Sequence, residues 1–257
     1  MEMERNPFTH AIRAGAKQVG LWVTLSNNFV ADVIAPAGYD WVLLDMEHSP
    51  NDYFSIIGQL QTFAGTRTTA IVRVEWNNPV AVKRVLDIGA PGLLFPMIQS
   101  VEEAEAAVAA TRYPPRGIRG AAGSTRATKF GRITDYVQRV EDETTVLLQL
   151  ETVAAVEQAE AIADVDGVDG IFFGPGDISA DMGKMGKPMD PEVWALIKPA
   201  AQKLIAKGMP VGTLVLDAGF AAELLNEGFS FVACGTDTSI LARGTDVLLA
   251  QVKDQMD

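Results

Sequence analysis

Residues 146–174 read VLLQLETVAAVEQAEAIADVDGVDGIFFG: a short apolar run, a helical interval and a second short apolar run. The two runs, residues 146–151 and 170–174, are apolar almost throughout instead of alternating with polar residues. Continuous apolar character is typical of parallel strands that are buried on both faces. The stretch therefore predicts one strand–helix–strand unit of an α/β protein.

This unit recurs along the whole chain. Helical intervals separate short apolar runs at residues 19–25, 41–45, 70–74, 92–96, 146–151, 170–174, 211–215 and 231–235. Asn78 and Ser100 are typical helix N-caps. Glycine follows several helical patterns, as at Gly89, Gly208 and Gly228.

Repeated units of this kind in 257 residues match the length of one (β/α)₈ barrel. We therefore predict a single domain, residues 1–257, with an α/β fold of the TIM-type (β/α)₈ barrel. An open doubly wound sheet fits the same alternation and is the alternative fold. Residues 111–135 and 174–188 depart from this alternation of apolar runs and helical intervals. Irregular segments of that length are usually functional or contact surfaces.

The composition limits the partners. The chain carries 33 acidic and 21 basic residues, a formal net charge of −12, which disfavours nucleic acid and membrane surfaces. An anionic substrate would need a local arginine or a metal ion. The single cysteine, Cys234, cannot form an internal disulfide, the N-terminus lacks a signal-peptide pattern, and no apolar run approaches the roughly 18 residues of a membrane helix. We expect a soluble cytoplasmic protein.

Ionisable residues cluster where the second apolar run ends, at Asp45-Met46-Glu47-His48. In a barrel, catalytic groups project from the C-terminal ends of the strands. One turn of backbone would bring the Asp45 carboxylate to the His48 ring, where it would fix the tautomer and raise the basicity that a general base needs. Alternatively, Asp45 caps the next helix and His48 is a solvated turn residue.

Arg73 lies inside the third apolar run. A guanidinium is costly to bury there unless it meets an anion. We interpret Arg73 as a contact for an anionic substrate. A structural ion pair with Glu47 or Asp45 is the alternative.

Two carboxylates follow adjacent strands near the expected barrel mouth. Strand alternation places Gln149 and Glu151 on one face, towards the interior, and Asp177 follows the sixth run in the stretch GPGD. Carboxylate oxygens suit Mg²⁺ or Mn²⁺, and water and substrate complete the coordination. The glycines let backbone N–H groups approach a ligand closely. The alternative is that Asp177 caps a turn and Glu151 opens a helix.

Other chemistry is not indicated. The sequence holds neither a G-x-x-x-x-G-K-[ST] phosphate loop nor a G-x-S-x-G nucleophile elbow. No lysine lies within an apolar run, which argues against a Schiff-base mechanism. Residues 233–237, after the eighth run, form either an anion site or a simple strand-to-helix turn.

Several of these motifs together resemble the HpcH/HpaI aldolase family, whose members are class II, metal-dependent aldolases that act on pyruvate. The similar stretches are WVLLDMEHSP (41–50), VR (72–73), RYPPRGIRG (112–120), QLET (149–152), GPGDIS (174–179) and VACGTDT (232–238). The resemblance covers nearly the whole chain. One departure is Gly176, where a close relative has Ala; because the backbone N–H is retained, we expect no loss of role.

The resemblance implies where metal and substrate bind. Glu151 and Asp177 would ligate a divalent metal such as Mg²⁺, Mn²⁺ or Co²⁺, and Gln149 would lie close to pyruvate. The pyruvate carboxylate would sit on backbone N–H groups near Gly176 and Asp177. We interpret Trp22, on the first run, as a wall of this site; a core tryptophan is the alternative.

The resemblance also implies catalytic roles and an assembly. Arg73 would contact the keto oxygen, and His48, oriented by Asp45, would act as the acid–base group together with a water on the metal. Similar proteins form hexamers, as trimers of dimers, and exchange their C-terminal helices between subunits.

We therefore predict a carbon–carbon lyase that adds the enolate of pyruvate, or of a related 2-keto acid such as hydroxypyruvate, to an aldehyde and gives 4-hydroxy-2-keto acids. An acyl-CoA lyase of the malyl or citramalyl type is an alternative. The arginines of the irregular segment would favour it: Arg112, Arg116, Arg119 and Arg126. A non-catalytic binding protein on a barrel scaffold is the other alternative.

Overall fold

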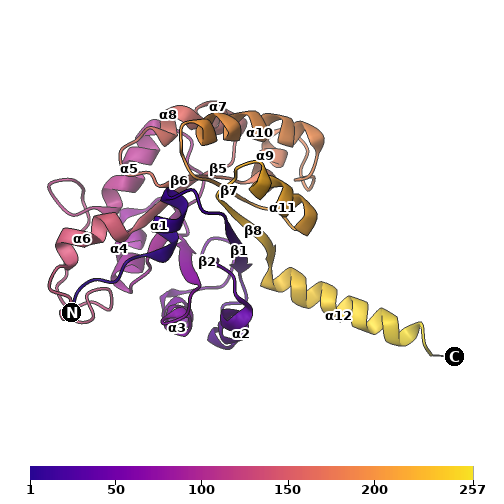
Figure 1. Ribbon diagram of the computed structural model, residues 1–257, viewed down its shortest axis with the longest axis horizontal. Coiled ribbons are helices and arrows are strands. Elements are labelled where there is room, and N and C mark those ends of the chain that lie inside the picture. Colours follow the sequence, from indigo (N-terminus) through magenta and orange to yellow (C-terminus); the bar gives the residue numbers. More distant parts are fainter. Residues whose placement is uncertain (257) are drawn as a thin grey trace.

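The computed structural model describes residues 1–256 and shows a closed eight-stranded barrel (Figure 1). All neighbouring strands pair in parallel, and β1 closes the barrel against β8. The predicted (β/α)₈ barrel is confirmed, and the open sheet is excluded. The strands are β1 (Gln18–Val23), β2 (Trp41–Asp45), β3 (Thr69–Arg73), β4 (Gly92–Phe95), β5 (Thr145–Leu150), β6 (Gly170–Phe173), β7 (Val211–Leu214) and β8 (Phe231–Thr236).

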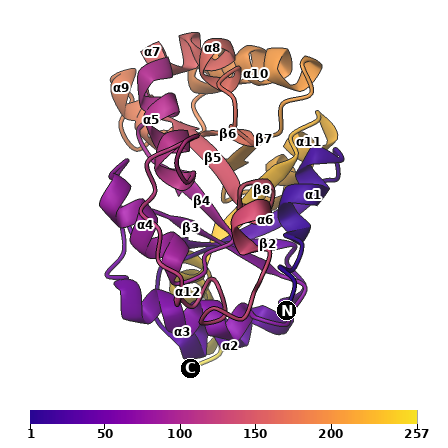
Figure 2. The ribbon, with the colours of Figure 1, turned by 90° about the vertical axis from the view of Figure 1, so that its left-hand side faces the viewer.

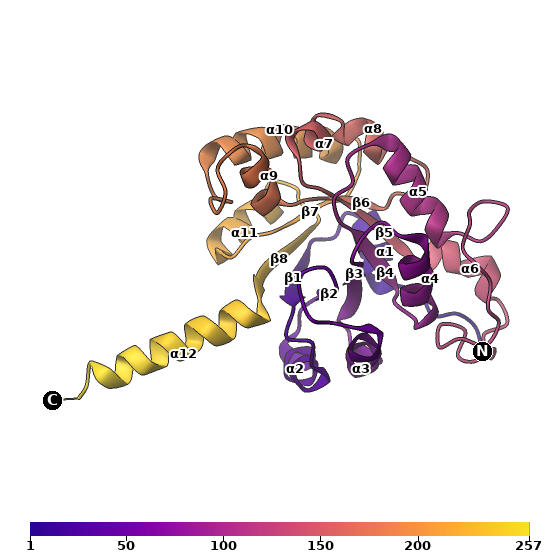
Figure 3. The same cartoon turned by 180° about the vertical axis from the view of Figure 1, so that it is seen from behind.

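Helices lie around the barrel and connect successive strands (Figure 3). Between β1 and β5 these are α2 (Asn28–Ile34), the 3₁₀ turn η1 (Ala35–Ala37), α3 (Tyr53–Phe63), α4 (Pro79–Asp87), α5 (Val101–Thr111) and α6 (Tyr136–Glu143). After β5 they are α7 (Val153–Glu157), α8 (Ala159–Ala163), α9 (Pro175–Asp181), α10 (Pro191–Ala206), α11 (Ala218–Asn226) and α12 (Asp237–Lys253).

The predicted helix boundaries are largely confirmed. Asn78 caps α4 and Ser100 caps α5 through their side chains. In a capping box, the Glu103 carboxylate would accept the backbone N–H of the N-cap Ser100. Here it accepts the backbone N–H of the preceding residue, Gln99, at 2.7 Å. Glycines in the left-handed conformation follow α4, α10 and α11: Gly89, Gly208 and Gly228.

The barrel interior is filled with large side chains. Trp41, Phe172 and Phe231 are each at most 1% exposed and belong to one interior cluster. Two glycines make room for these rings: a Cβ on Gly20 would lie 2.2 Å from a Trp41 ring atom, and a Cβ on Gly212 would lie 2.2 Å from a Phe231 ring atom. The interior is therefore a packed core, and chemistry is confined to the strand ends.

Helix α1 (Pro7–Arg13), which the sequence pattern did not predict, closes the N-terminal end of the barrel. Its Phe8 ring packs against Trp41 with the ring centroids 5.5 Å apart. Asn6 caps the helix, and its side-chain amide donates to the Thr145 hydroxyl at 3.0 Å. This plug leaves the opposite, C-terminal end for the functional groups.

Two segments depart from the barrel. Residues 112–135 are irregular, so the segment predicted at 111–135 is confirmed except for Thr111, which ends α5; the segment predicted at 174–188 instead contains α9. The chain's N-terminus lies beside residues 112–135, with the Met1 amino group donating to the Arg132 carbonyl at 2.9 Å (Figure 2). Helix α12 projects away from the barrel (Figures 1 and 3). It exposes the apolar side chains Ile240, Leu241, Val247, Leu248, Leu249 and Val252. Within residues 1–256, no helix combines the length and the apolar character needed to cross a membrane.

Candidate active site

Asp45 and Arg73 are the last residues of the neighbouring strands β2 and β3 and lie in register. Their side chains form a bidentate ion pair, in which Arg73 Nε donates to Asp45 Oδ1 at 2.9 Å and Nη2 donates to Oδ2 at 2.6 Å. Both are buried, with 6% of Arg73 and 1% of Asp45 exposed. Burial would raise the pKa of Asp45, but the hydrogen bonds and the charge of Arg73 outweigh burial and lower that pKa.

Trp22 on β1 contacts both members of this ion pair. Its indole Nε1 donates to Asp45 Oδ2 at 3.3 Å, and the Arg73 guanidinium carbon lies 5.0 Å from the ring centroid. This distance is within the range of a cation–π interaction. Trp22 is only 3% exposed and belongs to the interior cluster, so the core interpretation applies. Its contact with substrate stays a prediction.

Glu47 belongs to the same cluster, although the sequence pattern offered it only as an ion-pair partner. Its Oε2 lies 2.7 Å from Arg73 Nη1, so Arg73 forms both of the structural ion pairs that the sequence left open. Burial raises the pKa of Glu47 even though the charge of Arg73 opposes this. Arg73 still keeps N–H groups that neither carboxylate uses, and these remain for a further anion.

The structure does not show the predicted contact between the Asp45 carboxylate and the His48 ring. Asp45 Oδ1 accepts the backbone N–H of His48 at 3.4 Å, whereas the ring Nε2 lies 3.7 Å from Glu47 Oε2. The predicted arrangement is corrected because Arg73 and Trp22 already occupy the Asp45 carboxylate. The His48 side chain is 67% exposed, and its catalytic role stays a prediction.

Gln149 and Glu151 lie together at the end of β5, as strand alternation predicts. Glu151 accepts hydrogen bonds from Gln149 Nε2 at 2.7 Å and from the Met97 backbone N–H at 2.9 Å. Only 2% of Glu151 is exposed. Burial, together with the nearby carboxylates of Asp177 and Glu47, raises the pKa of Glu151 to about 8.

Gly176 and Asp177 occupy the first turn of α9, directly after β6. Backbone N–H groups in a first turn have no partner within the helix. A Cβ on Gly176 would meet no atom within 4 Å, so alanine fits there. A Cβ on Gly174 would lie 2.7 Å from Glu151 Oε1, so the close approach of Glu151 to α9 requires glycine at that position.

The oxygen atoms of this site suit a hard cation. Gln149 Oε1 is buried without a hydrogen-bond partner among the described residues, whereas Glu47 Oε2 has the ion pair with Arg73. An acceptor oxygen that lacks a donor and lies close to carboxylates is a group that a divalent cation satisfies. No three His, Cys, Asp or Glu side chains within residues 1–256 are already arranged as a ligand set. A cation here would therefore depend on carboxylates such as Glu151 and Asp177 and on non-protein ligands.

Three arginines of the irregular segment are paired within the protein, and a fourth, Arg126, lines a cavity at the N-terminal side of the barrel. Arg112 and Arg116 both pair with Glu141, at 2.8 Å each. Arg119 is buried and pairs with Asp87 at 2.8 Å. These side chains are therefore neutralised within the protein, and the acyl-CoA alternative gains no phosphate-binding groups from them.

Residues 233–237 lie at the junction of β8 and α12, because β8 extends to Thr236 and α12 begins at Asp237. The Asp237 carboxylate accepts the backbone N–H groups of Thr24 at 2.9 Å and Leu25 at 3.0 Å. These bonds join the start of α12 to the loop after β1. The backbone N–H groups of Thr236, Thr238 and Ser239 donate to side-chain oxygens within the same turn of helix. The strand-to-helix interpretation of residues 233–237 is therefore the one that fits.

Comparison with known proteins identifies the family. A model of the HpcH/HpaI aldolase/citrate lyase family matches residues 18–243. The chain belongs to this family. The resemblance seen in the sequence is therefore confirmed.

Full-length relatives and solved structures agree with this assignment. Over 251 residues the chain is 48% identical to a pyruvate aldolase of Rhizobium etli, covering 98% of this chain and 99% of the relative. It is 46% identical over 248 residues to a 4-hydroxy-2-oxo-heptane-1,7-dioate aldolase of Salmonella dublin, covering 96% and 94%. A solved HpcH/HpaI aldolase/citrate lyase family protein from Burkholderia cenocepacia J2315 has a TM-score of 0.93 at 35% identity, covering 96% and 99%.

Proposed function

We propose that this protein is a carbon–carbon lyase that reversibly adds the enolate of pyruvate, or of a related 2-keto acid such as hydroxypyruvate, to an aldehyde and forms 4-hydroxy-2-keto acids. The family and the aldolase names of its full-length relatives support this. The observation that carries the proposal is the buried Arg73–Asp45 ion pair beside the buried Glu151, at the strand ends where barrel enzymes hold their substrates.

A divalent metal fits the oxygen donors of the site. We assign Glu151 and Asp177 as its protein ligands, and carboxylates suit Mg²⁺, Mn²⁺ or Co²⁺. When bound, such an ion supplies a Lewis acid for the oxygen of the 2-keto acid. Its charge would also stabilise the ionised form of Glu151, whose pKa is raised by burial and by the neighbouring carboxylates.

Arg73 stabilises the charge that forms on the substrate. Removing a methyl proton from pyruvate places negative charge on the keto oxygen, and a fixed guanidinium near that oxygen stabilises the transition state more than the ground state. Asp45 and Trp22 hold the guanidinium in place. The pyruvate carboxylate receives the backbone N–H groups of Gly176 and Asp177, where the start of α9 favours an anion.

His48 transfers the proton in this proposal, and Gln149 lies beside the bound 2-keto acid. The His48 ring is exposed, so substrate and solvent reach it, and Glu47 is the carboxylate placed to orient it. Asp45 acts on Arg73 and on the backbone N–H of His48. None of the eight strands contains a lysine, which is consistent with enolate chemistry without a Schiff base.

We also propose that the protein is a hexamer, a trimer of dimers, in which α12 packs against a neighbouring subunit. The exposed apolar side chains along this projecting helix support the proposal, because contiguous apolar surface of this kind is usually buried in an interface. Light scattering should give a mass well above the 27.6 kDa of one chain. A monomer at micromolar concentration would contradict this assembly.

The test of the proposed function is turnover with and without metal. Pyruvate released from a 4-hydroxy-2-keto acid should disappear after exhaustive chelation and return with Mg²⁺, Mn²⁺ or Co²⁺. Full turnover in protein that elemental analysis shows to be free of metal would contradict the assignment of Glu151 and Asp177. Malyl-CoA is assayed in parallel, and cleavage of that thioester without aldol turnover would favour the acyl-CoA alternative.

A further inference from the structure

Arg126, in the irregular segment, lacks a carboxylate partner. Within residues 1–256 it forms no ion pair, and its recorded hydrogen bond runs from Nη1 to the Ile88 carbonyl at 2.8 Å. The side chain is half-buried, and burial lowers the pKa of its guanidinium. A partly desolvated guanidinium without a counter-charge is costly, so its position indicates a missing anion.

Arg126 borders a cavity of about 350 Å³ at the N-terminal side of the barrel. The chain's first seven residues, the ends of α3 and α4 and the start of β3 line it. Thr69 of β3 borders the cavity, whereas Arg73 stands at the other end of that strand, so the cavity is remote from the candidate active site. The apolar part of its wall comprises Leu60, Phe63, Leu86, Ala90 and Val140.

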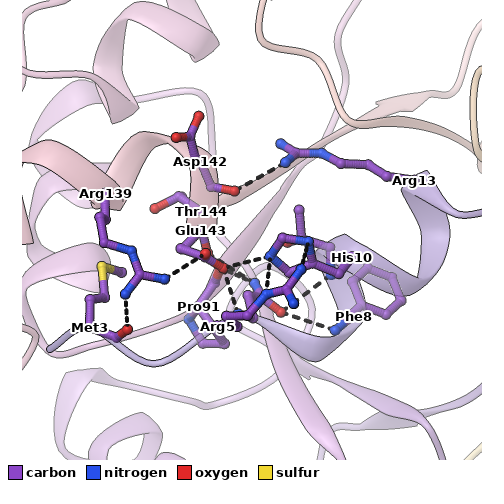
Figure 4. Close-up of polar contacts among 12 residues, drawn as sticks. Met3, Arg5, Phe8, His10, Arg13, Pro91, Arg139, Asp142, Glu143 and Thr144 are labelled. Carbon is purple, nitrogen blue, oxygen red and sulfur yellow. Dashed lines mark hydrogen bonds and ion pairs between the residues drawn. The ribbon is translucent and has the colours of Figure 1, made fainter.

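A second cation, Lys129, lines the same cavity and forms no ion pair within residues 1–256. Lys129 is exposed, and its left-handed backbone, with φ at 49°, belongs to a turn that Phe130 and Gly131 continue. Three carboxylates also line the cavity: Glu2 and Glu4 are exposed, and the buried Glu143 is already bound to His10 and Arg139 (Figure 4). None of the three forms an ion pair with Arg126 or Lys129 in the part of the chain that the structure describes.

We propose that this cavity binds a small organic anion: a carboxylate or phosphate monoester carried on a compact apolar body. Arg126 and Lys129 supply the charge, and the apolar wall supplies a surface for the remainder of the ligand. The volume is at the lower end of the range for small-molecule sites. In a protein with a net charge of −12, an anion needs such a local pair of cations. The proposal does not depend on the aldolase reaction.

The test is isothermal titration of the full-length protein with phenylacetate and with phenyl phosphate. The titrations are run on the wild type and on Arg73→Ala, so that anion binding at the candidate active site is separated from binding in the cavity. Phenylacetamide is the neutral control, and inorganic phosphate is the control without an apolar body. At least one of the two aryl anions should bind, and both controls should bind more weakly.

Matched variants locate the site. Arg126→Gln keeps a donor for the Ile88 carbonyl but removes the charge, and it should weaken binding about 10- to 100-fold, while Arg126→Lys should retain part of the affinity. Arg67→Gln is the control, because Arg67 is an exposed neighbour that does not line the cavity. Should Arg126→Gln fail to fold, Lys129→Gln should also weaken binding of the aryl anion, by a smaller factor.

Several results would overturn the proposal. These are absence of binding by both aryl anions, unchanged affinity in a folded Arg126→Gln variant, or equal binding of phenylacetamide. Inorganic phosphate binding as tightly as phenyl phosphate would overturn the assignment of an apolar body. Aldol turnover in Arg126→Gln should equal that of the wild type, which keeps this test separate from the test of the proposed function.

Discussion

The two ends of β5 each carry a buried glutamate, and the surroundings of the two differ. Glu151 follows the C-terminal end and is 2% exposed, whereas Glu143 precedes the N-terminal end and is 6% exposed. Burial and neighbouring carboxylates raise the pKa of Glu151 to about 8. Burial acts on Glu143 in the same direction, but its hydrogen bonds from Asn6, His10 and Arg139 outweigh it and lower the pKa of Glu143.

The difference shows how one strand serves two purposes. At the N-terminal end, the Glu143 carboxylate has hydrogen-bond partners within the chain, so it stabilises the fold. At the C-terminal end, Glu151 is buried close to the carboxyl groups of Asp177 and Glu47, which costs stability and suits the cation proposed for this site. The barrel therefore separates its stabilising polar cluster from its candidate reactive cluster by the length of β5.

The largest predicted effect is on turnover. Glu151→Gln should reduce aldol turnover by at least about 10²- to 10³-fold, because it removes the proposed metal ligand from the site where substrate charge develops. Glu143→Gln, the same change at the other end of β5, should leave turnover per folded molecule within about twofold. Steady-state rates of both purified variants under saturating metal check this. Similar losses in the two variants would erase the functional distinction between the two ends.

Within the C-terminal cluster, replacement of Arg73 and replacement of His48 should have different effects on catalysis. Arg73→Ala should reduce both aldol turnover and the exchange of pyruvate methyl protons with deuterated water by about 10²- to 10³-fold, because each step makes or consumes the enolate. His48→Ala should reduce turnover by about 10²- to 10⁴-fold while leaving binding of pyruvate and metal largely intact. NMR of the exchange and steady-state rates provide the measurement. Near-normal turnover of His48→Ala across pH 6–9 would leave Glu47 as the candidate base.

The free energy of unfolding should depend on Glu143 and not on Glu151, which is the reverse of the effect on turnover. Glu143→Gln should lower the free energy of unfolding by about 1–3 kcal/mol, because charged hydrogen bonds from Asn6, His10 and Arg139 are weakened. The pKa of Glu143 is lowered from its usual 4.5, so this contribution is complete above pH 4.5 and is lost as the pH falls through the lower native value. Metal-free Glu151→Gln should be at least as stable as the wild type.

Urea unfolding of wild type and Glu143→Gln between pH 3 and 7 tests this sign. The difference in unfolding free energy should be constant in the upper part of the range and shrink towards its acidic end. A difference that grew on acidification would show that the Glu143 carboxylate destabilises the native state.

The smallest predicted effect is at Gly176. Gly176→Ala should change turnover by less than about twofold and stability by about 0.5 kcal/mol or less, because a Cβ there meets no atom within 4 Å and the backbone N–H is kept. Gly174→Ala is the matched contrast, since its Cβ would meet Glu151 Oε1 at 2.7 Å and displace that carboxylate. It should reduce turnover by about 10²-fold. Equal behaviour of the two variants would contradict the tight packing of Glu151 on α9.

Local patterns in the sequence determined much of the architecture and of the candidate site. Continuous apolar runs predict buried parallel strands wherever they occur, and the period of a strand alone places Gln149 and Glu151 on one face. Cap residues such as Asn78 and Ser100 act within one helical turn, so their positions are also readable from the chain. Helix α1 was missed because its role as a plug depends on a contact between Phe8 and Trp41 that is distant in sequence.

Only the tertiary structure decided how the charges are partnered. The sequence places Asp45 and His48 three positions apart and favours a direct carboxylate–imidazole contact, but strand pairing sets Asp45 beside Arg73, which takes its carboxylate and leaves the His48 ring near Glu47. Likewise, composition cannot show that hydrogen bonds lower the pKa of Glu143 whereas burial raises the pKa of Glu151. Hydrophobic periodicity is a local property of the chain, whereas an ion pair depends on which residues the closed barrel brings within a few ångströms.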